Sequence, residues 1–185
     1  MQNYQDFLSE ILIDEESLKK RTAELGAQIS ADYPEGNLLL ICILRGGVPF
    51  LVDLSRKISS PHAMDFMAVS SYGIGKRESS GTVRVSLDLQ TDIRDKDVLL
   101  VEDIIDSGHT IASVLELLHI RQPRSLKVCT LLDKVERREA AVPVHYCGFV
   151  IPNKFVFGYG LDIDEYYRNL PFVGVVDLDK YIPPS

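Results

Sequence analysis

The residues with the clearest chemical potential stand together in one stretch, which reads VLLVEDIIDSGHT over residues 98–110. Glu102 and Asp103 follow an aliphatic run typical of a buried strand, where carboxylates are costly unless they meet a cation or a hydroxyl-bearing ligand. Residues 107–110 follow at the expected junction of this strand with a helix, where backbone N–H groups and hydroxyls converge on bound phosphates. The stretch therefore predicts a site for a phosphorylated ligand.

The same residues also have a purely structural explanation. Asp-Ser-Gly before a helix is a common N-cap and turn, and acids just past a strand are ordinary in open α/β domains. The combined run of four aliphatics, two acids, two aliphatics and Asp-Ser-Gly-x-Thr favours the ligand site. Other phosphate motifs are excluded, because GxxxxGK[ST] is absent and Gly158-Tyr-Gly160 lacks the third glycine and the following helix of a dinucleotide fingerprint.

The elements around this stretch alternate between buried strands and amphipathic helices. Apolar periodicity predicts helices at 14–33, 48–58 and 111–118, and strands at 37–44, 63–70, 82–89, 98–101, 126–132, 145–151 and 173–178. Residues 70–81, SSYGIGKRESSG, predict a loop whose flanking strands pair as a hairpin. We expect an α/β fold with an open, mainly parallel twisted sheet, helices on both faces, and ligands at the carboxyl ends of the strands.

Length and charge limit the possible classes of protein. The chain has 185 residues, 45% of them hydrophobic and 25% charged, with no internal repeat or linker, so one domain over residues 1–185 is expected. The formal net charge of −7 is the wrong sign for a protein that binds along a nucleic acid. A small anionic ligand is not excluded, since net charge does not describe a pocket.

The cysteines and the start of the chain bear on the compartment. Cys42, Cys129 and Cys147 are far apart, each inside an apolar run, and fit reduced core thiols better than disulfides or zinc ligands. The start is polar and acidic, unlike a signal peptide, and no apolar run approaches the length of about eighteen residues that spans a membrane. We expect a cytoplasmic protein that does not bind membranes.

The stretch at 98–110 resembles the phosphoribosyl pyrophosphate (PRPP) binding motif of type I phosphoribosyltransferases. Other segments narrow the resemblance to the hypoxanthine-guanine phosphoribosyltransferases: LRGG at 44–47, SSYG at 70–73, Lys134, NKFVFGYGLD at 153–162 and EYYRNLP at 165–171. The resemblance covers roughly residues 38–177 with the family's order and spacing. It implies the type I fold, with a core at about 37–150 and a small hood from about 1–15 and 151–185.

The resemblance also implies a reaction and its partners. The enzyme would transfer the 5-phosphoribosyl group from PRPP to N9 of hypoxanthine or guanine, releasing pyrophosphate and giving IMP or GMP in purine salvage, with Mg²⁺ as cofactor. A homodimer or homotetramer is implied. Three alternatives are a xanthine-preferring transferase, an RNA-binding regulator that keeps the PRPP motif, and a non-catalytic flavodoxin-like domain. Lys134, the complete segment at 153–162 and the absence of a marked basic cluster favour the enzyme.

The resemblance assigns most of the PRPP site to the 98–110 stretch. The 5′-phosphate is expected on five consecutive residues, Asp106, Ser107, Gly108, His109 and Thr110, of which His109 stands where the family has Lys, Arg or Asn. Glu102 and Asp103 would hold the ribose hydroxyls, directly or through Mg²⁺ and its waters. Asp106 would also act as the general base near the imidazole nitrogen of the purine.

The leaving pyrophosphate is assigned to a second group of residues. By resemblance, Arg45, Gly46 and Arg168 would bind it, Asp162 would hold a second Mg²⁺, and the Leu44–Arg45 peptide bond is often cis in the family. The four assigned acids outnumber the three assigned basic residues, so binding of PRPP is expected to depend on Mg²⁺.

Purine recognition falls to Lys134, Phe155, Val156 and Asp162. A lysine donates to a 6-oxo group but cannot accept from a 6-amino group, so adenine should be rejected. Phe155 would stack on the base, although the residue pattern by itself suggests that Phe155, Phe157 and Tyr159 are core aromatics. Lys154 is as compatible with a solvated or subunit-facing position as with a ligand contact. Ser71 and Tyr72 would belong to a lid that closes over PRPP.

Overall fold

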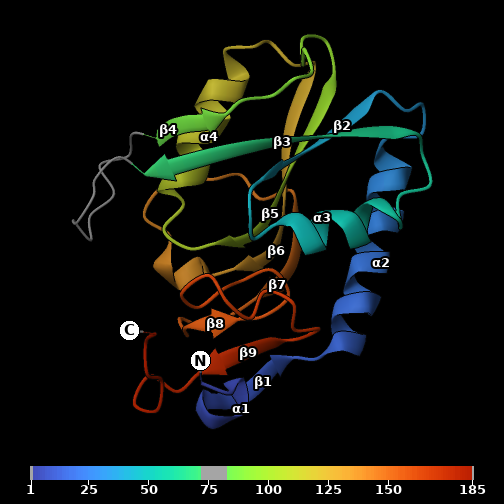
Figure 1. Cartoon of the computed structure of the whole chain (residues 1–185). Coiled ribbons are helices and arrows are strands. Elements are labelled where there is room, and N and C mark those ends of the chain that lie inside the picture. The colour runs from blue at the N-terminus through green and yellow to red at the C-terminus, as the bar shows by residue number, and fades with distance from the viewer. Residues whose placement is uncertain (1, 72–82, 185) are drawn as a thin grey trace.

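The computed structural model describes residues 2–71 and 83–184, which form one large and one small β-sheet (Figure 1). The large sheet has the strand order β4-β3-β2-β5-β6-β7. These strands are β2 (Leu38–Ile43), β3 (His62–Ser71), β4 (Val83–Leu87), β5 (Asp97–Ile105), β6 (Ser125–Asp133) and β7 (Tyr146–Val150). All neighbours are parallel except the β3–β4 hairpin at one edge. The predicted open, mainly parallel sheet and its hairpin are confirmed.

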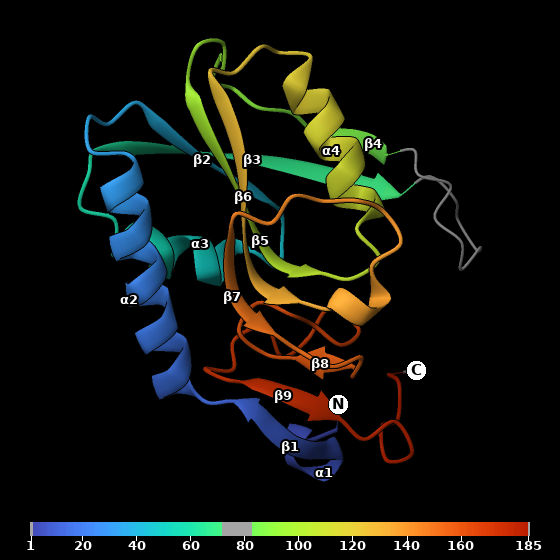
Figure 2. The ribbon, with the colours of Figure 1, turned by 180° about the vertical axis from the view of Figure 1, so that it is seen from behind.

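Helices cover both faces of the large sheet, as predicted (Figures 1 and 2). Because side chains alternate along a strand, β2 sends Leu38, Leu40 and Cys42 to the face of α2 (Glu15–Asp32) and α3 (Val48–Ser55). Its other residues pack with α4 (His109–His119) on the opposite face. None of the described helices is long and apolar enough to cross a bilayer.

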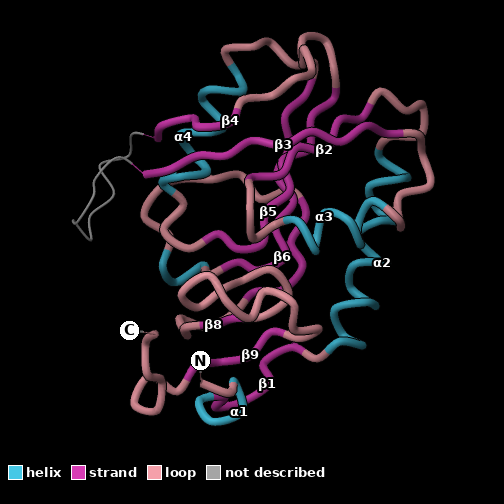
Figure 3. Tube along the Cα trace, in the orientation of Figure 1, coloured by secondary structure: helices cyan, strands magenta, loops and turns pink. Residues whose placement is uncertain are grey.

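The small sheet, which we call the hood, has the order β1-β9-β8 and brings the two ends of the chain together (Figures 1 and 3). It contains β1 (Leu8–Ile13), β8 (Val156–Phe157) and β9 (Val173–Val176), preceded by α1 (Tyr4–Phe7). The strand predicted at 173–178 thus pairs with β1 and β8, not with the large sheet. Aromatic rings hold the hood together, with the Phe7 ring 5.0–5.4 Å from those of Phe157, Tyr167 and Tyr181.

Two element boundaries differ from the sequence prediction and matter for the site. β5 continues to Ile105 because its pairing with β6 continues past Glu102, so Glu102 and Asp103 lie inside the strand. α4 begins at His109, which places His109 and Thr110 in its first turn instead of in the connection before it. Ser71 ends β3, whereas Tyr72 and nearly all of the predicted loop lie outside the described residues.

The cysteines are free thiols, as expected. Cys42 and Cys129 are buried and Cys147 is half-buried. Burial is the main reason why the pKa of the Cys42 and Cys129 thiols lies well above the usual range. These two side chains therefore act as small apolar core residues.

Replacing Phe7 should show how much the core of the hood contributes to the stability of the fold. Phe7→Ala removes a fully buried ring and should lower the free energy of unfolding by about 3–5 kcal/mol. Phe155→Ala, a matched control whose side chain is half exposed, should cost about 1 kcal/mol or less. Urea unfolding of both variants measures the difference. Equal losses would contradict the assignment of Phe7 as the centre of the hood core.

Candidate active site

The candidate site lies where β2, β5 and β6 end, since parallel strands bring their carboxyl ends to one edge of the sheet. The connection after β5 lines a cavity of about 220 Å³ together with Ile43 and Glu102. The same cavity is lined by Asp106, Ser107 and Thr110, three of the residues predicted to bind PRPP. The structure therefore opens a pocket at the predicted motif.

Gly46, in the turn after β2, touches both the central strand and the segment between β8 and β9. A Cβ atom on Gly46 would lie 1.7 Å from Oδ2 of Asp103, and a Cβ on Gly160 would lie 2.0 Å from the carbonyl oxygen of Gly46. Gly160, whose φ is +101° and whose Cβ would meet backbone, therefore requires glycine, and a side chain at Gly46 would have to displace the Asp103 carboxylate. The peptide bond between Leu44 and Arg45 is cis. The predicted pyrophosphate turn thus lies directly against a predicted ribose-binding acid.

Glu102 and Asp103 carry carboxyl groups with few partners. Glu102 is buried, its Oε1 has no hydrogen-bond partner among the described residues, and desolvation together with the charge of Asp103 raises its pKa well above the usual range. Asp103 Oδ1 accepts a hydrogen bond from the backbone N–H of Ile104 at 2.7 Å, and desolvation raises the pKa of Asp103 to about 6. Buried carboxyl groups with so few partners favour the binding of a cation or a hydroxyl-bearing ligand.

The chemistry of Glu102 and Asp103 suits a hard divalent metal ion. Mg²⁺ takes oxygen ligands, is commonly bound through one or two carboxylates, and keeps several waters. Adjacent, poorly partnered Glu102 and Asp103 fit that requirement. Within the described residues no group of three or more His, Cys, Asp or Glu side chains is arranged to hold a metal ion. Asp162 lies apart from these two acids, and its Oδ1 pairs with Arg168 at 2.9 Å.

Asp106 forms the centre of a charged group after β5. Its Oδ2 lies 3.2 Å from the Nζ of Lys134, which is almost fully buried at the end of β6, and its Oδ1 lies 3.1 Å from the Nε of Arg137. Burial raises the pKa of Asp106, but the hydrogen bonds and charges of Arg137 and Lys134 outweigh it, and the net pKa is lowered. Arg137, in the short helix η1 (Val135–Arg137), was missed at the sequence level, although it follows Lys134 by only three positions.

The segment after η1 fixes the turn between β5 and α4 through hydrogen bonds. The carbonyl of Ser107 accepts hydrogen bonds from the backbone N–H groups of Glu139 and Ala140 at 2.9 and 3.0 Å. Gly108 is the N-cap of α4 with φ +88°, a left-handed conformation that favours glycine. His109 Nε2 lies 3.0 Å from a carboxylate oxygen of Glu139. The N-terminus of α4 is thus fixed at the cavity, where it favours an anion.

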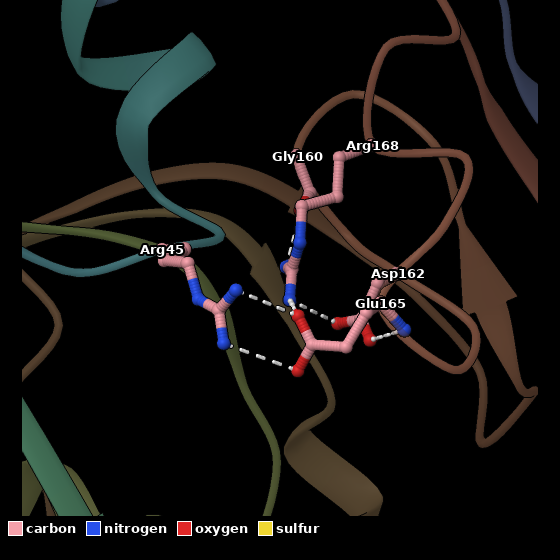
Figure 4. Close-up of polar contacts among 5 residues, drawn as sticks. All are labelled: Arg45, Gly160, Asp162, Glu165 and Arg168. Carbon is pink, nitrogen blue, oxygen red and sulfur yellow. Dashed lines mark hydrogen bonds and ion pairs between the residues drawn. The ribbon is translucent and has the colours of Figure 1, made fainter.

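Arg45 and Arg168 meet on a residue that the sequence reasoning did not select, Glu165 (Figure 4). Arg45 pairs with its carboxylate at 3.0 Å and Arg168 pairs with it at 3.2 Å. Arg168 also donates to the carbonyl of Gly160 at 2.8 Å, while its Nε is buried without a partner among the described residues. Glu165 is the first residue of the EYYRNLP segment. Its spacing of three positions from Arg168 is the one feature of the sequence that indicates a contact between the two side chains.

The aromatic residues of the purine segment separate into two classes. Phe157 is fully buried in the hood, and half-buried Tyr159 donates its hydroxyl to Asp53 at 2.8 Å, so the core interpretation is right for these two residues. It is wrong for Phe155, half of whose side chain is exposed. Val156 is buried in β8, and Lys154 forms an exposed ion pair with Glu10. Phe155 is therefore the aromatic residue of this segment that is free to meet a ligand.

Comparison with known proteins agrees with this geometry. Residues 9–164 match the family model of the phosphoribosyl transferase domain. The hypoxanthine phosphoribosyltransferase of Salmonella typhimurium is 51% identical over 92% of this chain and 97% of its own length. The hypoxanthine-guanine phosphoribosyltransferase of Mycobacterium avium is 48% identical, covering 96% of this chain and 90% of the relative. A crystal structure of a hypoxanthine phosphoribosyltransferase from Staphylococcus aureus superposes with a TM-score of 0.92 at 44% identity, covering 97% of both chains.

The fold is that of a type I phosphoribosyltransferase. The chain belongs to the phosphoribosyltransferase family and, within it, to the hypoxanthine-guanine phosphoribosyltransferases. The resemblance drawn from the sequence is confirmed, and the flavodoxin-like interaction domain is excluded as the family.

Gly46→Ala tests the close contact between the turn and Asp103. The added Cβ must displace the carboxylate, so we expect Mg²⁺-dependent binding of pyrophosphate, measured by calorimetry, to weaken at least tenfold. Overpacking should also lower the free energy of unfolding by about 1–3 kcal/mol. Gly36→Ala, at a left-handed glycine away from the site, should cost about 1 kcal/mol and leave pyrophosphate binding unchanged. Unaltered binding in Gly46→Ala would disprove the steric argument.

Proposed function

We propose that the protein catalyses Mg²⁺-dependent transfer of the 5-phosphoribosyl group from PRPP to N9 of hypoxanthine or guanine. The products are IMP or GMP and pyrophosphate, as in purine salvage. The observation that carries the proposal is the 3.2 Å pair of Lys134 and Asp106, which sets a buried donor for a 6-oxo group beside an ionised carboxylate at the PRPP motif. The names of the relatives, which include both hypoxanthine and hypoxanthine-guanine phosphoribosyltransferases, support the substrate class.

The reaction breaks the bond from the anomeric carbon to pyrophosphate and forms a bond from that carbon to the purine nitrogen. With its lowered pKa, Asp106 is ionised at neutral pH, as an ordinary aspartate is, and its carboxylate would accept the proton that leaves the imidazole ring of the purine. A positioned acid or base of this kind typically contributes about 10² to 10⁴ in rate. Lys134 orients the base by donating to its 6-oxo group.

The phosphate groups would be bound at two ends of the pocket. Ser107, Gly108, His109 and Thr110, at the start of α4, would bind the 5′-phosphate through backbone N–H groups and hydroxyls. Arg45, Gly46 and Arg168 would bind the pyrophosphate. Bound Mg²⁺ would neutralise charge on the diphosphate as it leaves. Glu102 and Asp103 would hold that ion or the ribose hydroxyls, and Asp162 would hold a second ion.

Selectivity for the base would come from Lys134, Phe155, Val156 and Asp162. Phe155 would stack on the purine, and the backbone carbonyls of Val156 and Asp162 would accept from the 2-amino group of guanine. An assay with PRPP, Mg²⁺ and each of hypoxanthine, guanine, xanthine, adenine and uracil tests the proposal. We expect product from hypoxanthine or guanine, a loss of about 10⁴-fold or more with adenine, and no activity in EDTA. Failure with both oxopurines would refute the function.

The chain is best described as one domain, with a core at about 37–150 and a hood from about 1–15 and 151–185. The pairing of β1 with β9 supports this division, because it joins the two ends of the chain in one sheet. We infer a cytoplasmic enzyme that assembles as a homodimer or homotetramer. Size-exclusion chromatography with light scattering would contradict the assembly if only a monomer were found at micromolar concentration.

Arg137→Ala should change the pH dependence of the reaction. The Arg137 cation stabilises the ionised form of Asp106, so its removal should raise the pKa of Asp106 toward its ordinary value. The acid limb of the kcat/KM profile should then move to higher pH, while the KM for PRPP changes less than twofold.

A surface arginine provides the control for that measurement. Arg121 forms a comparable exposed ion pair with Asp88 at 2.8 Å, and Arg121→Ala should leave the pH profile unchanged. An acid limb that stays in place in Arg137→Ala would show that Arg137 does not act on Asp106.

A further inference from the structure

The carboxylate of Glu165 lies between two arginines that come from separate parts of the molecule (Figure 4). Arg45 belongs to the turn after β2 of the large sheet, and its Nη1 lies 3.0 Å from Oε2 of Glu165 and its Nη2 3.3 Å from Oε1. Arg168 belongs to the segment between β8 and β9, and its Nη2 lies 3.2 Å from Oε2. One carboxylate therefore engages both guanidinium groups and links the core to the hood.

The two arginines depend on Glu165 to different degrees. Arg168 is also held by the carbonyl of Gly160 at 2.8 Å and by Asp162 at 2.9 Å. For Arg45, Glu165 is the ion-pair partner found within residues 2–71 and 83–184. Displacement of Glu165 would thus free Arg45 entirely, while Arg168 would keep its orientation.

The backbone fixes where the Glu165 carboxylate lies. Glu165 has φ +72°, in the left-handed region that costs a non-glycine residue free energy and persists where neighbouring contacts require it. Its N–H donates to Oδ2 of Asp162 at 2.8 Å. Asp164 beside it accepts from the hydroxyl of Tyr181 at 2.6 Å. The side chain is exposed, but it projects from an anchored turn.

A carboxylate and a diphosphate group interact with a guanidinium group in the same way. Both accept the planar pair of N–H donors that arginine presents, and both are favoured by its charge. With Glu165 and Asp162 in place, the charges of Arg45 and Arg168 are already balanced. A diphosphate that takes the Nη1 and Nη2 donors now paired with Glu165 must therefore displace its carboxylate.

We propose that Glu165 is an internal competitor for the diphosphate group. Its carboxylate occupies Arg45 and Arg168 when no ligand is bound, gives them up when PRPP or pyrophosphate binds, and takes them back when pyrophosphate leaves. This inference rests on the proposed function, because that function assigns the two arginines to pyrophosphate. It makes Glu165 a determinant of affinity for diphosphates without any contact to the purine.

Glu165→Gln tests the proposal by removing the charge while keeping the shape of the side chain. We expect the Kd for pyrophosphate, measured by calorimetry at fixed Mg²⁺, and the KM for PRPP to fall three- to tenfold. The KM for hypoxanthine should stay within twofold. Glu165→Asp, which keeps the charge, should bind pyrophosphate more nearly as the wild type does. Unchanged or weaker binding in Glu165→Gln would overturn the proposal.

A matched control removes another exposed carboxylate. Glu24 pairs with Arg21 at 2.8 Å on α2, and Glu24→Gln should change neither the Kd for pyrophosphate nor the KM for PRPP. An equal gain in both Gln variants would mean that net charge alone sets affinity, which would also overturn the proposal.

A measurement on the wild type decides the matter if Glu165→Gln does not fold. In crystals soaked with Mg²⁺ and pyrophosphate, the Glu165 carboxylate should lie more than 4 Å from the guanidinium group of Arg45. An Arg45–Glu165 ion pair that persists with pyrophosphate bound would contradict the proposal. The proposed function is judged separately, by nucleotide formation in the wild type. A wild type that forms no nucleotide refutes that function, whereas an active wild type with no response in Glu165→Gln refutes only the competitor role.

Discussion

The site depends on one close contact between backbones. The turn after β2 can approach Asp103 on one side and Gly160 on the other only because neither Gly46 nor Gly160 carries a Cβ atom. This contact sets the pyrophosphate turn beside the acids of β5 and brings the hood segment against the large sheet. The meeting of Arg45 with Glu165 and Arg168 follows from it, because those side chains come from the segments that the two glycines join. The charged side chains of this site can thus meet because Gly46 and Gly160 carry no side chain.

Charge is distributed in the site so that most cations already have an acidic partner. Lys134 and Arg137 share Asp106, and Arg45 and Arg168 share Glu165. Glu102 and Asp103 are the opposite case, since neither forms an ion pair within the described residues, and desolvation raises the pKa of both. A net charge of −7 is therefore compatible with the proposed function, in which these two acids would take up Mg²⁺ before or together with the polyphosphate ligand.

Much of this arrangement was predictable from the sequence because it depends on local patterns. The sheet, both helix layers, the hairpin and the position of the PRPP motif follow from apolar periodicity and from one contiguous stretch at 98–110. The end of β5 and the start of α4 were not predictable from local patterns. The end of β5 depends on its pairing with β6, and the start of α4 depends on the turn at Gly108. Burial of Phe157 but not Phe155 depends on the hood, whose strands come from opposite ends of the chain. Arg137 and Glu165 were missed because a charged residue on an exposed turn gains a role only through partners distant in sequence.

The paired charges have a consequence for turnover. Binding of a polyanion to free arginines would gain the full attraction of each pair, and an enzyme that held pyrophosphate so tightly would release it slowly. Where each arginine already has a carboxylate partner, ligand binding exchanges one ion pair for another, and the net gain is smaller. Binding energy that is the same for the substrate and the transition state does not raise kcat, so its reduction costs little in the chemical step. Under the proposed competition, the anchored turn that presents Glu165 to both arginines therefore favours release of the product over maximal affinity.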